Sequence, residues 1–513
     1  MRVDVDWRSA LAMVGRVLTY LGVPLAVPLL VALYYGEPAW PFVTTILVTA
    51  AAGMALSRLR GEPELGTREG FLMVSVTWLF VSVIGALPYV LAGIGTASTL
   101  AMPVNALFES MSGFTTTGAT VMGKISTERH SRAILLWRQL TQWLGGMGIV
   151  VLAVAILPEL SVGGAQLMDA EAPGPGLEKL TPRITETARS LWLVYFGVTA
   201  IEVILLYGLN VAGFAPNMTA YNAVAHGFTT LSTGGFSPEA RSIEAFSAAV
   251  QWLIIPFMVL AGTNFALIWH VSRGELGALI EDAEFRVYVG ILGVVTALLT
   301  GLLFSGLGVE AAIPNTEPVV GGIEPALRHA AFQAAAIVTT TGYASLDFNA
   351  WSPIAQTVLF IAIFIGGSAG STGGAIKIVR WYVIVKSLGR ELFTTVTPSA
   401  VRPVRLGGRA LDEDAVRGIH AFTLLYMLLF GLGVLVVMLD STRLARDLST
   451  FEVASAVAAT IGNVGPGFGI VGPMNSYEPF TRTSKLVMIV LMWAGRLELF
   501  PVGVLLTRAY WRR

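Results

Sequence analysis

Four short loops that end in glycine recur along the whole chain. Three read Thr115-Thr116-Thr117-Gly118, Leu231-Ser232-Thr233-Gly234 and Thr339-Thr340-Thr341-Gly342, and a divergent fourth reads Gly462-Asn463-Val464-Gly465. Their last glycines lie 116, 108 and 123 residues apart (118→234→342→465), and recurrence on this scale indicates a repeated structural unit. Each copy follows a short apolar segment of 12 to 14 residues, a length that suits a re-entrant helix better than a full span.

Threonine and glycine in such loops suit the binding of a bare cation. An ion that leaves water needs replacement oxygens, and backbone carbonyls supply them without a fixed charge. Glycine lets the backbone leave regular geometry and lets several chains approach closely. Irregular backbone is tolerated at membrane depth where it is buried in protein or faces water, and the C-terminal ends of the preceding helices would direct partial negative charge toward a cation. We therefore predict that the four loops converge on one axis and line a narrow pore.

The predicted ion-binding residues are Thr116, Thr117, Gly118, Ser232, Thr233, Gly234, Thr340, Thr341, Gly342, Asn463, Val464 and Gly465. Close packing of membrane helices is the alternative, because Gly, Ser and Thr are common at such contacts. Four spaced copies, each between a short apolar segment and a full span, favour the pore.

Composition indicates a membrane protein. Hydrophobic residues make up 54% of the 513 residues and charged residues only 13%, with a mean hydropathy of +0.70, whereas a soluble protein carries about 25% charged residues. The 33 basic and 33 acidic residues cancel, so no net charge suggests a nucleic-acid partner. The chain has no cysteine, which excludes disulfides and thiolate metal sites. No H-E-x-x-H or Walker motif supports catalysis.

The apolar segments predict ten spans and four short re-entrant segments. The first run, 17–35, exceeds the ~7–15 residues of a signal-peptide core, so we expect a retained helix. Two spans come first, at 12–35 and 39–57. Four pairs follow, at 71–94 and 132–158, 188–212 and 247–271, 286–309 and 350–388, and 417–439 and 483–508. The re-entrant segments are 103–114, 218–229, 325–338 and 449–460.

The predicted fold is an all-α integral membrane protein with four pseudo-repeated units around one pore. Each unit consists of a helix, a re-entrant pore helix, a filter loop and a second helix. The predicted divisions are a two-helix preface at 1–66 and pore units at 67–160, 161–275, 276–390 and 391–513, the second unit including a cytoplasmic linker.

Lysine and arginine gather on one predicted face, which we expect to be cytoplasmic. Both termini lie on this face, and the glycine loops then enter from outside. Its basic residues are Arg2, Arg8, Arg58, Arg60, Arg68, Lys377, Arg380, Lys386, Arg390, Arg402, Arg405, Arg409, Arg417, Arg512 and Arg513. The opposite face carries fewer, namely Lys124, Arg129, Arg443 and Arg446.

A glycine-rich run interrupts the segment 350–388. It contains five glycines within residues 366–374. Each glycine costs a helix interior ~0.8–1 kcal/mol relative to alanine, so we expect the helix to break there. A flexible break below a filter could block the pore and move aside, as discontinuous helices do in transporters; a passive kink is the alternative. The predicted gate residues are Gly366, Gly367, Gly370, Ser371, Thr372, Gly373, Gly374 and Arg496.

Ionisable residues at membrane depth are functional candidates. Arg496 and Glu498 interrupt the last span, and residues two apart on a helix do not face each other, so they need different partners. A buried structural ion pair is the alternative role of Arg496. We expect Lys377 to extend to the cytoplasmic surface.

Other buried acids and one histidine have simpler interpretations. Glu109 and Glu452 lie in the first and fourth re-entrant segments. They either raise the local cation concentration or satisfy backbone donors, and the sequence does not separate these roles. We interpret Glu202 and His226 as packed polar groups.

These motifs resemble those of the Trk/Ktr/HKT potassium transporter superfamily, especially its TrkH-like pore-forming subunits. The resemblance covers nearly the whole chain and rests on FESMSGFTTTGAT (108–120), TQWLGGMG (141–148), EKLTPRI (178–184) and STGGFS (232–237). In that family four non-identical units form one pore, and a glycine in every filter loop accompanies preference for K⁺ over Na⁺. The matching residues are Gly118, Gly234, Gly342 and Gly465. Sodium-preferring relatives carry serine at the first position, and the fourth loop here departs by lacking threonine.

The resemblance also implies a gate and partners. The stretch matching 366–374 is an intramembrane loop below the filter, and Arg496 matches a pore-lining basic residue that contacts it. The implied assembly is a homodimer that binds a cytosolic, TrkA-like ring of nucleotide-binding subunits through segments 159–187 and 389–416. The implied location is the plasma membrane of a bacterium or archaeon, with K⁺ as the transported ion. Two alternatives stay open: a symporter coupling K⁺ to Na⁺ or H⁺ through Glu109, Glu202 or Arg496, and a membrane enzyme or scaffold without conduction.

Overall fold

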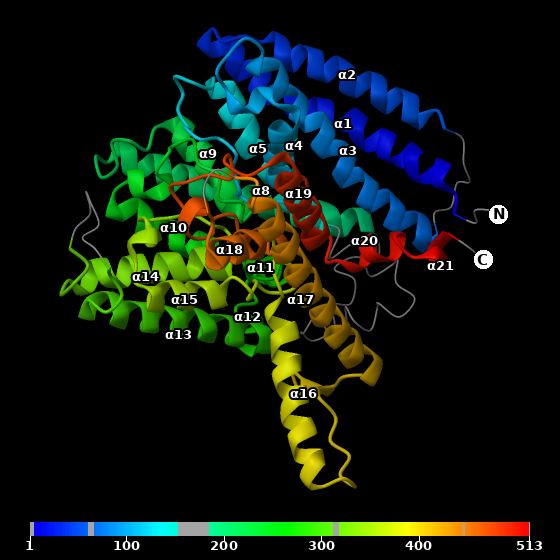
Figure 1. Cartoon of the computed structure of the whole chain (residues 1–513), viewed down its shortest axis with the longest axis vertical. Helices are drawn as coiled ribbons and strands as arrows, with labels where there is room; N and C mark the ends of the chain where they lie inside the picture. The colour runs from blue at the N-terminus through cyan, green and yellow to red at the C-terminus, as the bar shows by residue number, and fades with distance from the viewer. Residues whose placement is uncertain (1–4, 60–65, 152–183, 311–317, 445–446, 512–513) are drawn as a thin grey trace.

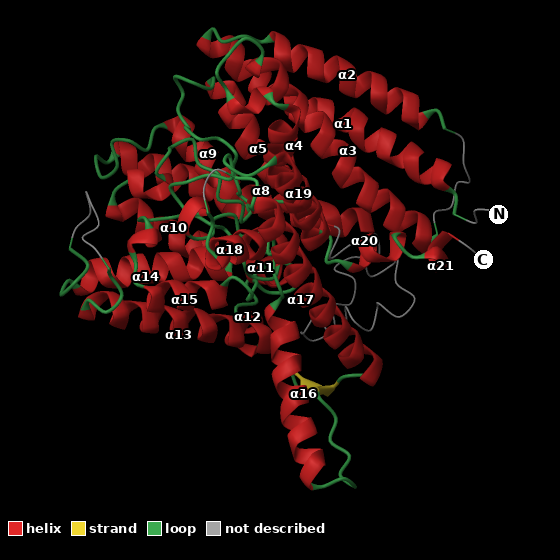
Figure 2. Ribbon diagram, viewed as in Figure 1, coloured by secondary structure: helices red, strands yellow, loops and turns green. Residues whose placement is uncertain are grey.

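The computed structural model describes residues 5–59, 66–151, 184–310, 318–444 and 447–511. Helices dominate these residues (Figure 2). The strands within the described ranges are β1 (Arg405–Leu406) and β2 (Arg409–Ala410). They follow α16 (Ile378–Val396) in the chain and pair antiparallel. The all-helical prediction is therefore confirmed for the described residues.

Six described helices are long and apolar enough to cross a membrane. They are α1 (Trp7–Tyr35), α2 (Trp40–Ser57), α3 (Thr67–Gly93), α8 (Ile184–Val211), α13 (Ala283–Ser305) and α17 (Glu413–Ser441). The first two pack closely because small residues face each other: a Cβ atom at Gly15 or Gly53 would overlap the neighbouring helix. Such small-residue contacts are typical of helix packing in membranes. These spans make the chain a membrane protein.

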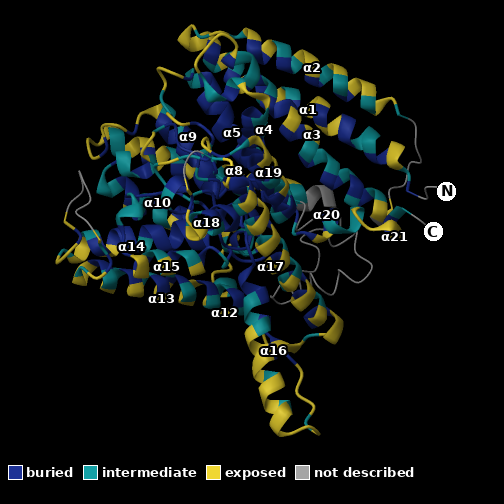
Figure 3. Ribbon diagram, viewed as in Figure 1, coloured by how far each residue is buried: buried dark blue, intermediate teal, exposed yellow. Residues whose placement is uncertain are grey.

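Four shorter helices lie in the interior, where the predicted re-entrant segments fall. They are α4 (Pro103–Phe114), α9 (Ala220–Leu231), α14 (Ile323–Val338) and α18 (Thr450–Ile461). Most of their residues are buried, and Figure 3 shows the buried residues gathered at the centre of the molecule. Each helix runs directly into one glycine loop, as the sequence predicts.

The second helix of the later units is broken. The described part of the first unit's second helix is α5 (Arg132–Val151), and residues 152–158 of the predicted span lie outside the described residues. The broken pairs are α10 (Ala248–Ala261) with α11 (Phe265–Ser272), α15 (Pro353–Ala362) with α16 (Ile378–Val396), and α19 (Arg482–Arg496) with α20 (Phe500–Leu505). The break between α15 and α16 was predicted from the glycine run and is confirmed.

The prediction of continuous helices at 247–271 and 483–508 is wrong. Helices α10 and α11 meet at 106°, and the side chain of Asn264 starts α11 by accepting from the amide of Ala266. In the last span, Glu498 and Leu499 both have left-handed φ angles, of 57° and 60°, and Pro501 lies in the first turn of α20. Local caps and turns therefore end these helices inside apolar segments.

The remaining elements are short. They are η1 (Thr99–Ala101), η3 (Ser242–Ala245), α12 (Gly277–Glu281), η4 (Phe348–Ala350), η5 (Gly469–Val471) and α21 (Arg508–Trp511). The two chain ends lie close together (Figure 1), and the Tyr510 hydroxyl donates to the Arg68 carbonyl at the start of α3. Helix α16 projects beyond the body of the molecule (Figure 1).

Candidate functional site: a ring of four glycine loops

The four loops share one backbone path. Each begins with a residue of left-handed φ, at Thr116 (51°), Thr233 (51°), Thr340 (59°) and Asn463 (53°). Two residues later comes a glycine of left-handed φ, at Gly118 (79°), Gly235 (75°), Gly342 (73°) and Gly465 (98°). The first amide of each loop donates to the carbonyl three residues earlier, at Gly113, Thr230, Ile337 and Thr460. The four segments are therefore equivalent in conformation.

This equivalence corrects the register of the second loop. The counterpart of Gly118 is Gly235, whereas Gly234 takes the place of Thr117. The sequence prediction, which aligned Gly234 with Gly118, is one residue out of register. Leu231-Ser232 accordingly precede the loop, and Ser232 corresponds to Thr115.

The loops form a closed ring in chain order. A Cβ atom at any of the four equivalent glycines would come within 3.0 Å of a carbonyl oxygen in the next loop, closer than real Cβ atoms approach. The pairs are Gly118 with Gly234 O, Gly235 with Thr341 O, Gly342 with Val464 O, and Gly465 with Thr117 O. Glycine is required at each position by its φ angle and by this close approach.

A second layer of hydrogen bonds joins the same neighbours where the chain leaves the ring. The contacts are Arg138 Nη1 to Ser237 O (3.0 Å), Glu244 N to Ala344 O (3.0 Å), Gly469 N to Asn349 Oδ1 (2.9 Å) and Tyr477 N to Thr120 O (2.7 Å). They link the segments that follow loops one and two, two and three, three and four, and four and one. The cyclic order therefore holds in two independent sets of contacts.

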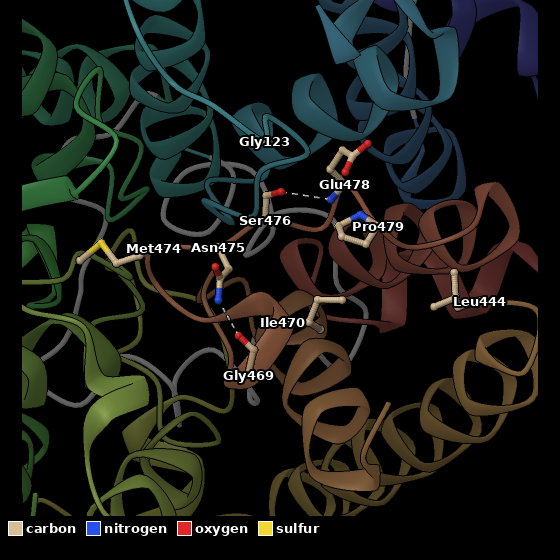
Figure 4. Close-up of a pocket in the computed structure, with 9 residues that line it drawn as sticks. All are labelled: Gly123, Leu444, Gly469, Ile470, Met474, Asn475, Ser476, Glu478 and Pro479. Carbon is tan, nitrogen blue, oxygen red and sulfur yellow. Dashed lines mark hydrogen bonds between the residues drawn. The ribbon is translucent and has the colours of Figure 1, made fainter. Parts of the chain in front are cut away.

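The four equivalent glycines line one cavity. Its volume is about 50 Å³, and its other lining residues include Arg138 and Glu239. Asn475 lines this cavity and also a larger one of about 520 Å³ beside it, which Figure 4 shows. The larger cavity carries the Glu478 side chain. Glu239 therefore lines the cavity of the ring, and Glu478 lines the cavity beside it.

Each interior helix also fastens the chain that leaves its loop. The fastening contacts are Glu109 Oε2 with Val121 N (2.9 Å), His226 Nε2 with Ser237 Oγ (3.0 Å), Gln333 Oε1 with Ser345 N (3.2 Å) and Ser455 Oγ with Phe468 N (2.9 Å). These four polar side chains lie at equivalent or adjacent positions of α4, α9, α14 and α18. They hold each loop in its irregular conformation.

The same contacts decide the open question about two acids. Glu109 forms a buried salt bridge of 2.5 Å with Arg138. Glu452 accepts from the amide of Ile470 at 3.0 Å and forms a capping box with Ser449. Both acids therefore satisfy donors within the protein. His226 is packed as expected, with its second ring nitrogen 2.7 Å from the Asn222 carbonyl.

Side chains inside the loops bond locally. The hydroxyl of Thr117 lies 2.7 Å from that of Thr115, and the hydroxyls of Thr339 and Thr341 repeat this contact. In the fourth loop, Asn463 Nδ2 donates to Thr117 Oγ1 at 2.9 Å. Threonine at these positions therefore braces the backbone.

Sequence reasoning did not find Gln142. This residue of α5 donates from Nε2 to the Gly234 carbonyl at 2.6 Å and accepts from the amide of Phe236 at 3.0 Å. Its side chain fills the space beside Gly234, where a Cβ would overlap it. The available signal was the T-Q-W-L-G-G run, in which a glutamine stands within an apolar helix.

The segment between α15 and α16, residues 363–377, lies against one side of the ring; we call it the gate segment after the role that the sequence predicts for it. The Thr372 carbonyl accepts from Thr233 Oγ1 at 2.8 Å, and the amide of Gly374 donates to Thr340 Oγ1 at 2.7 Å. A Cβ at Gly374 would overlap the Gly462 carbonyl. The gate segment therefore touches the first residues of loops two and three and the start of loop four.

The gate segment also uses carbonyls that the break after α10 leaves free. The amide of Ser368 donates to the Gly262 carbonyl at 2.8 Å, and the Thr372 hydroxyl donates to the Ala261 carbonyl at 3.0 Å. The gate segment thus supplies hydrogen-bond donors to the carbonyls that the end of α10 leaves without helical partners. Thr116 holds the same position in loop one as Thr233 and Thr340 hold in loops two and three. Its hydroxyl is buried without a partner among the described residues.

Arg496, at the end of α19, also contacts the gate segment. Its Nη1 donates to the Thr372 carbonyl at 2.7 Å, and the residue is 2% exposed. Its Nε and Nη2 find no partner in the described part of the chain. Glu498 instead pairs with Arg380, so the expectation of different partners for these two residues is correct.

Two basic residues are not at the surface. Lys377 is buried and its ammonium donates to the Gly373 carbonyl, so the expectation that it extends to the cytoplasm is wrong. Arg380, counted among the surface charges, is also buried, and its guanidinium lies 3.7 Å from the centre of the Phe422 ring. Both charges instead fasten the start of α16.

Glu202 is buried on α8, but it differs from a satisfied packed group. Its side chain is inaccessible to solvent, and neither carboxyl oxygen has a hydrogen-bond partner among the described residues. A buried ionised carboxylate without partners is strongly disfavoured. Glu202 therefore belongs among the functional candidates.

Apolar spans, a bent helix pair and a ring of buried loops define an all-helical, multi-pass membrane protein. The family described as "TrkH: Cation transport protein" matches residues 41–512. The chain is 37% identical to the Trk system potassium uptake protein TrkH of Halomonas elongata, over 99% of each chain. It is 35% identical to the protein of that name from Escherichia coli, over 99% of this chain and 100% of that one.

A solved structure has the same fold. The crystal structure of the potassium transporter TrkH from Vibrio parahaemolyticus superposes with a TM-score of 0.84 and 33% sequence identity, covering 98% of this chain and 99% of that one. The chain belongs to the TrkH family of cation transport proteins. This family consists of transporters, not of enzymes.

Proposed function

We propose that this protein takes up potassium through the ring of four glycine loops. The observation that carries the proposal is the closed ring of close approaches from glycine to carbonyl, which repeats four times in chain order. The relatives named as potassium uptake proteins, which match over nearly their full length, support the choice of ion. Backbone carbonyls replace the hydration shell of K⁺, and the loops of all four units contribute to one filter.

The direction of transport follows from the membrane potential. An inside-negative potential supplies ~2.3 kcal/mol per unit charge per 100 mV, so an open pore accumulates K⁺ without ATP hydrolysis in this chain. The carboxylates of Glu239, in the ring cavity, and Glu478, in the cavity beside it, raise the local cation concentration. We place the ring entrance outside the cell and both termini in the cytoplasm of a bacterium.

The gate segment closes the inner side of the filter. Its contacts with Thr233 and Thr340 and the Arg496 guanidinium below them obstruct the path and repel a cation. Opening then requires the gate segment to break its contacts with Thr233, Thr340 and Arg496. Deletion of 368–372 removes the obstruction.

A cytosolic partner controls this movement. We propose that a homodimer of this chain binds a TrkA-like ring of nucleotide-binding subunits. Segment 389–416, which includes the exposed end of α16 and the β1–β2 hairpin, supplies part of the docking surface. The second predicted docking segment, 159–187, lies almost entirely outside the described residues.

Uptake of Rb⁺, a K⁺ analogue, tests the proposal. Liposomes that contain the full chain and have an inside-negative potential should accumulate Rb⁺, and K⁺ should compete with it. The gene should also rescue growth in limiting potassium of a bacterium that lacks its own uptake systems. Absence of Rb⁺ uptake by the folded protein, with and without its partner, would rule out conduction. Single-channel currents would identify a channel.

Coupled symport is the second candidate, and Glu202 is the observation that favours it. Of the three residues that could carry coupling, Glu109 is neutralised by Arg138 and Arg496 binds the gate segment. Glu202 alone among them has a buried carboxyl group without a hydrogen bond, so it can carry a proton. Reversal potentials that follow the pH gradient in the native chain, but not in Glu202→Gln, would establish proton coupling.

A further inference from the structure

Glu284 connects α13 to the gate segment and to the start of α16. It lies in the first turn of α13 and is 1% exposed. Its Oε1 accepts from the amide of Ala369, within the glycine run, at 2.8 Å, and from the amide of Val379, in the first turn of α16, at 3.2 Å. One carboxylate therefore joins the gate segment, α16 and a membrane-spanning helix.

Helix α16 needs an acceptor from outside. The first amides of a helix have no partners within it, and a Ser, Thr, Asp or Asn at the N-cap normally supplies one. Here the N-cap is Lys377, whose ammonium cannot accept and which makes no side-chain cap bond. The amide of Ile378 donates to the Gly367 carbonyl at 3.2 Å, and Glu284 accepts from the next amide. The start of α16 is thus capped by the gate segment and by α13.

Glu284 has no comparable task in its own helix. Asp282 caps α13 by accepting from the amide of Phe285. The carboxylate of Glu284 instead reaches residues 85 and 95 positions away in sequence. A buried carboxylate is tolerated only when it is hydrogen-bonded or paired. The amides of Ala369 and Val379 supply these hydrogen bonds to Glu284.

We propose that Glu284 is a positioning residue that holds the gate segment in its observed place beneath the ring. This inference rests on the proposed function, because it assigns the gate segment the role of obstructing the filter. Without this carboxyl group, the amides of Ala369 and Val379 lose their shared acceptor, and the first turn of α16 loses part of its cap. The gate segment is then free to leave Thr233 and Thr340. Conduction becomes less dependent on the cytosolic partner.

Rb⁺ uptake by the full chain in liposomes, without any partner protein, tests this role. We expect Glu284→Ala to raise partner-free uptake roughly tenfold, the change that leaving a buried amide without its acceptor can produce. The Rb⁺/Na⁺ ratio should stay at its native value. Glu284→Gln keeps one acceptor oxygen without the charge and should give a smaller rise. Glu281→Ala, at an exposed position three residues away, should match the native chain.

The same measurements separate the possible failures. Native partner-free uptake in folded Glu284→Ala, or an altered Rb⁺/Na⁺ ratio, would overturn the positioning role. If Glu284→Ala does not fold, Glu284→Gln carries the same test. In a chain lacking 368–372, Glu284→Ala should add no further uptake; an additional rise would show that the residue acts elsewhere. If neither the native chain nor Glu281→Ala takes up Rb⁺ with a partner present, the proposed function fails instead.

Discussion

The α-carbon of Gly118 lies directly against the carbonyl oxygen of Gly234, leaving no room for a Cβ atom between the first and second loops. The same contact recurs around the ring, ending with Gly465 against the Thr117 carbonyl. Glycine at these positions therefore sets the distance between neighbouring loops, and so the width of the ring. In the proposed filter, this distance and the number of carbonyls would set the selectivity for an ion of one size.

Gly118→Ser should relax discrimination against Na⁺. The new side chain would overlap the Gly234 carbonyl and force a left-handed φ of 79° on serine, so the ring must open. We expect the Rb⁺/Na⁺ uptake ratio to fall by roughly tenfold, about 1.4 kcal/mol of selectivity. Gly123→Ser is the control, because a Cβ there meets no atom within 4 Å. An unchanged ratio in Gly118→Ser would exclude this loop from the filter.

Gly235→Ser should reproduce the effect of Gly118→Ser, because Gly235 is its counterpart in the second loop. A Cβ at Gly235 would overlap the Thr341 carbonyl. Gly213→Ser controls for backbone strain alone, since Gly213 has a left-handed φ of 82° but open space around it. Loss of Rb⁺/Na⁺ discrimination in Gly213→Ser, or native discrimination in Gly235→Ser, would contradict the assigned register.

Arg496→Gln should weaken the closed state. The guanidinium donates to the Thr372 carbonyl and places a positive charge beneath the ring. Its loss should raise partner-free Rb⁺ uptake by roughly tenfold, since hydrogen bonds from charged groups contribute ~1.5–3 kcal/mol. Arg482→Gln, at the exposed start of the same helix, is the matched control. Lower uptake by a folded Arg496→Gln protein would show that this charge supports conduction rather than closure.

Glu109→Ala should destabilise the protein. Removing one partner of a buried salt bridge leaves an uncompensated charge and costs ~3–5 kcal/mol, and the Val121 amide also loses its acceptor. Thermal unfolding in detergent, followed by tryptophan fluorescence, should show a lower midpoint than in the native chain. Glu128→Ala, in the exposed part of the same unit, should leave the midpoint unchanged. A native midpoint for Glu109→Ala would mean that Arg138 is not buried as described.

The sequence predicts the order and type of the central elements well. Short apolar segments before each glycine loop become the buried helices α4, α9, α14 and α18, because a length of 12 to 16 residues cannot span a bilayer. The five glycines of 366–374 correctly predict a break, since glycine disfavours the helix interior. These features are local, so composition and length suffice to find them.

Features that depend on neighbouring segments are not predictable in this way. Gly234 and Gly235 are adjacent and identical in type, and only contact with the Thr341 carbonyl distinguishes the second. The break after Ala261 is stabilised by Ser368, about a hundred positions later, whose amide replaces a lost helical donor at Gly262. Lys377 can be buried because the Gly373 carbonyl accepts a hydrogen bond from its ammonium. Each case is decided by tertiary contacts that periodicity does not encode.

The most direct measurement of the central claim is a crystal structure of the full chain with Rb⁺ in place of K⁺, with the anomalous signal of Rb⁺ recorded. An ordered Rb⁺ should lie on the axis enclosed by Gly118, Gly235, Gly342 and Gly465, within coordination distance of backbone carbonyl oxygens from all four loops. An intact ring that holds no Rb⁺, with the ion ordered elsewhere in the membrane region, would contradict the account.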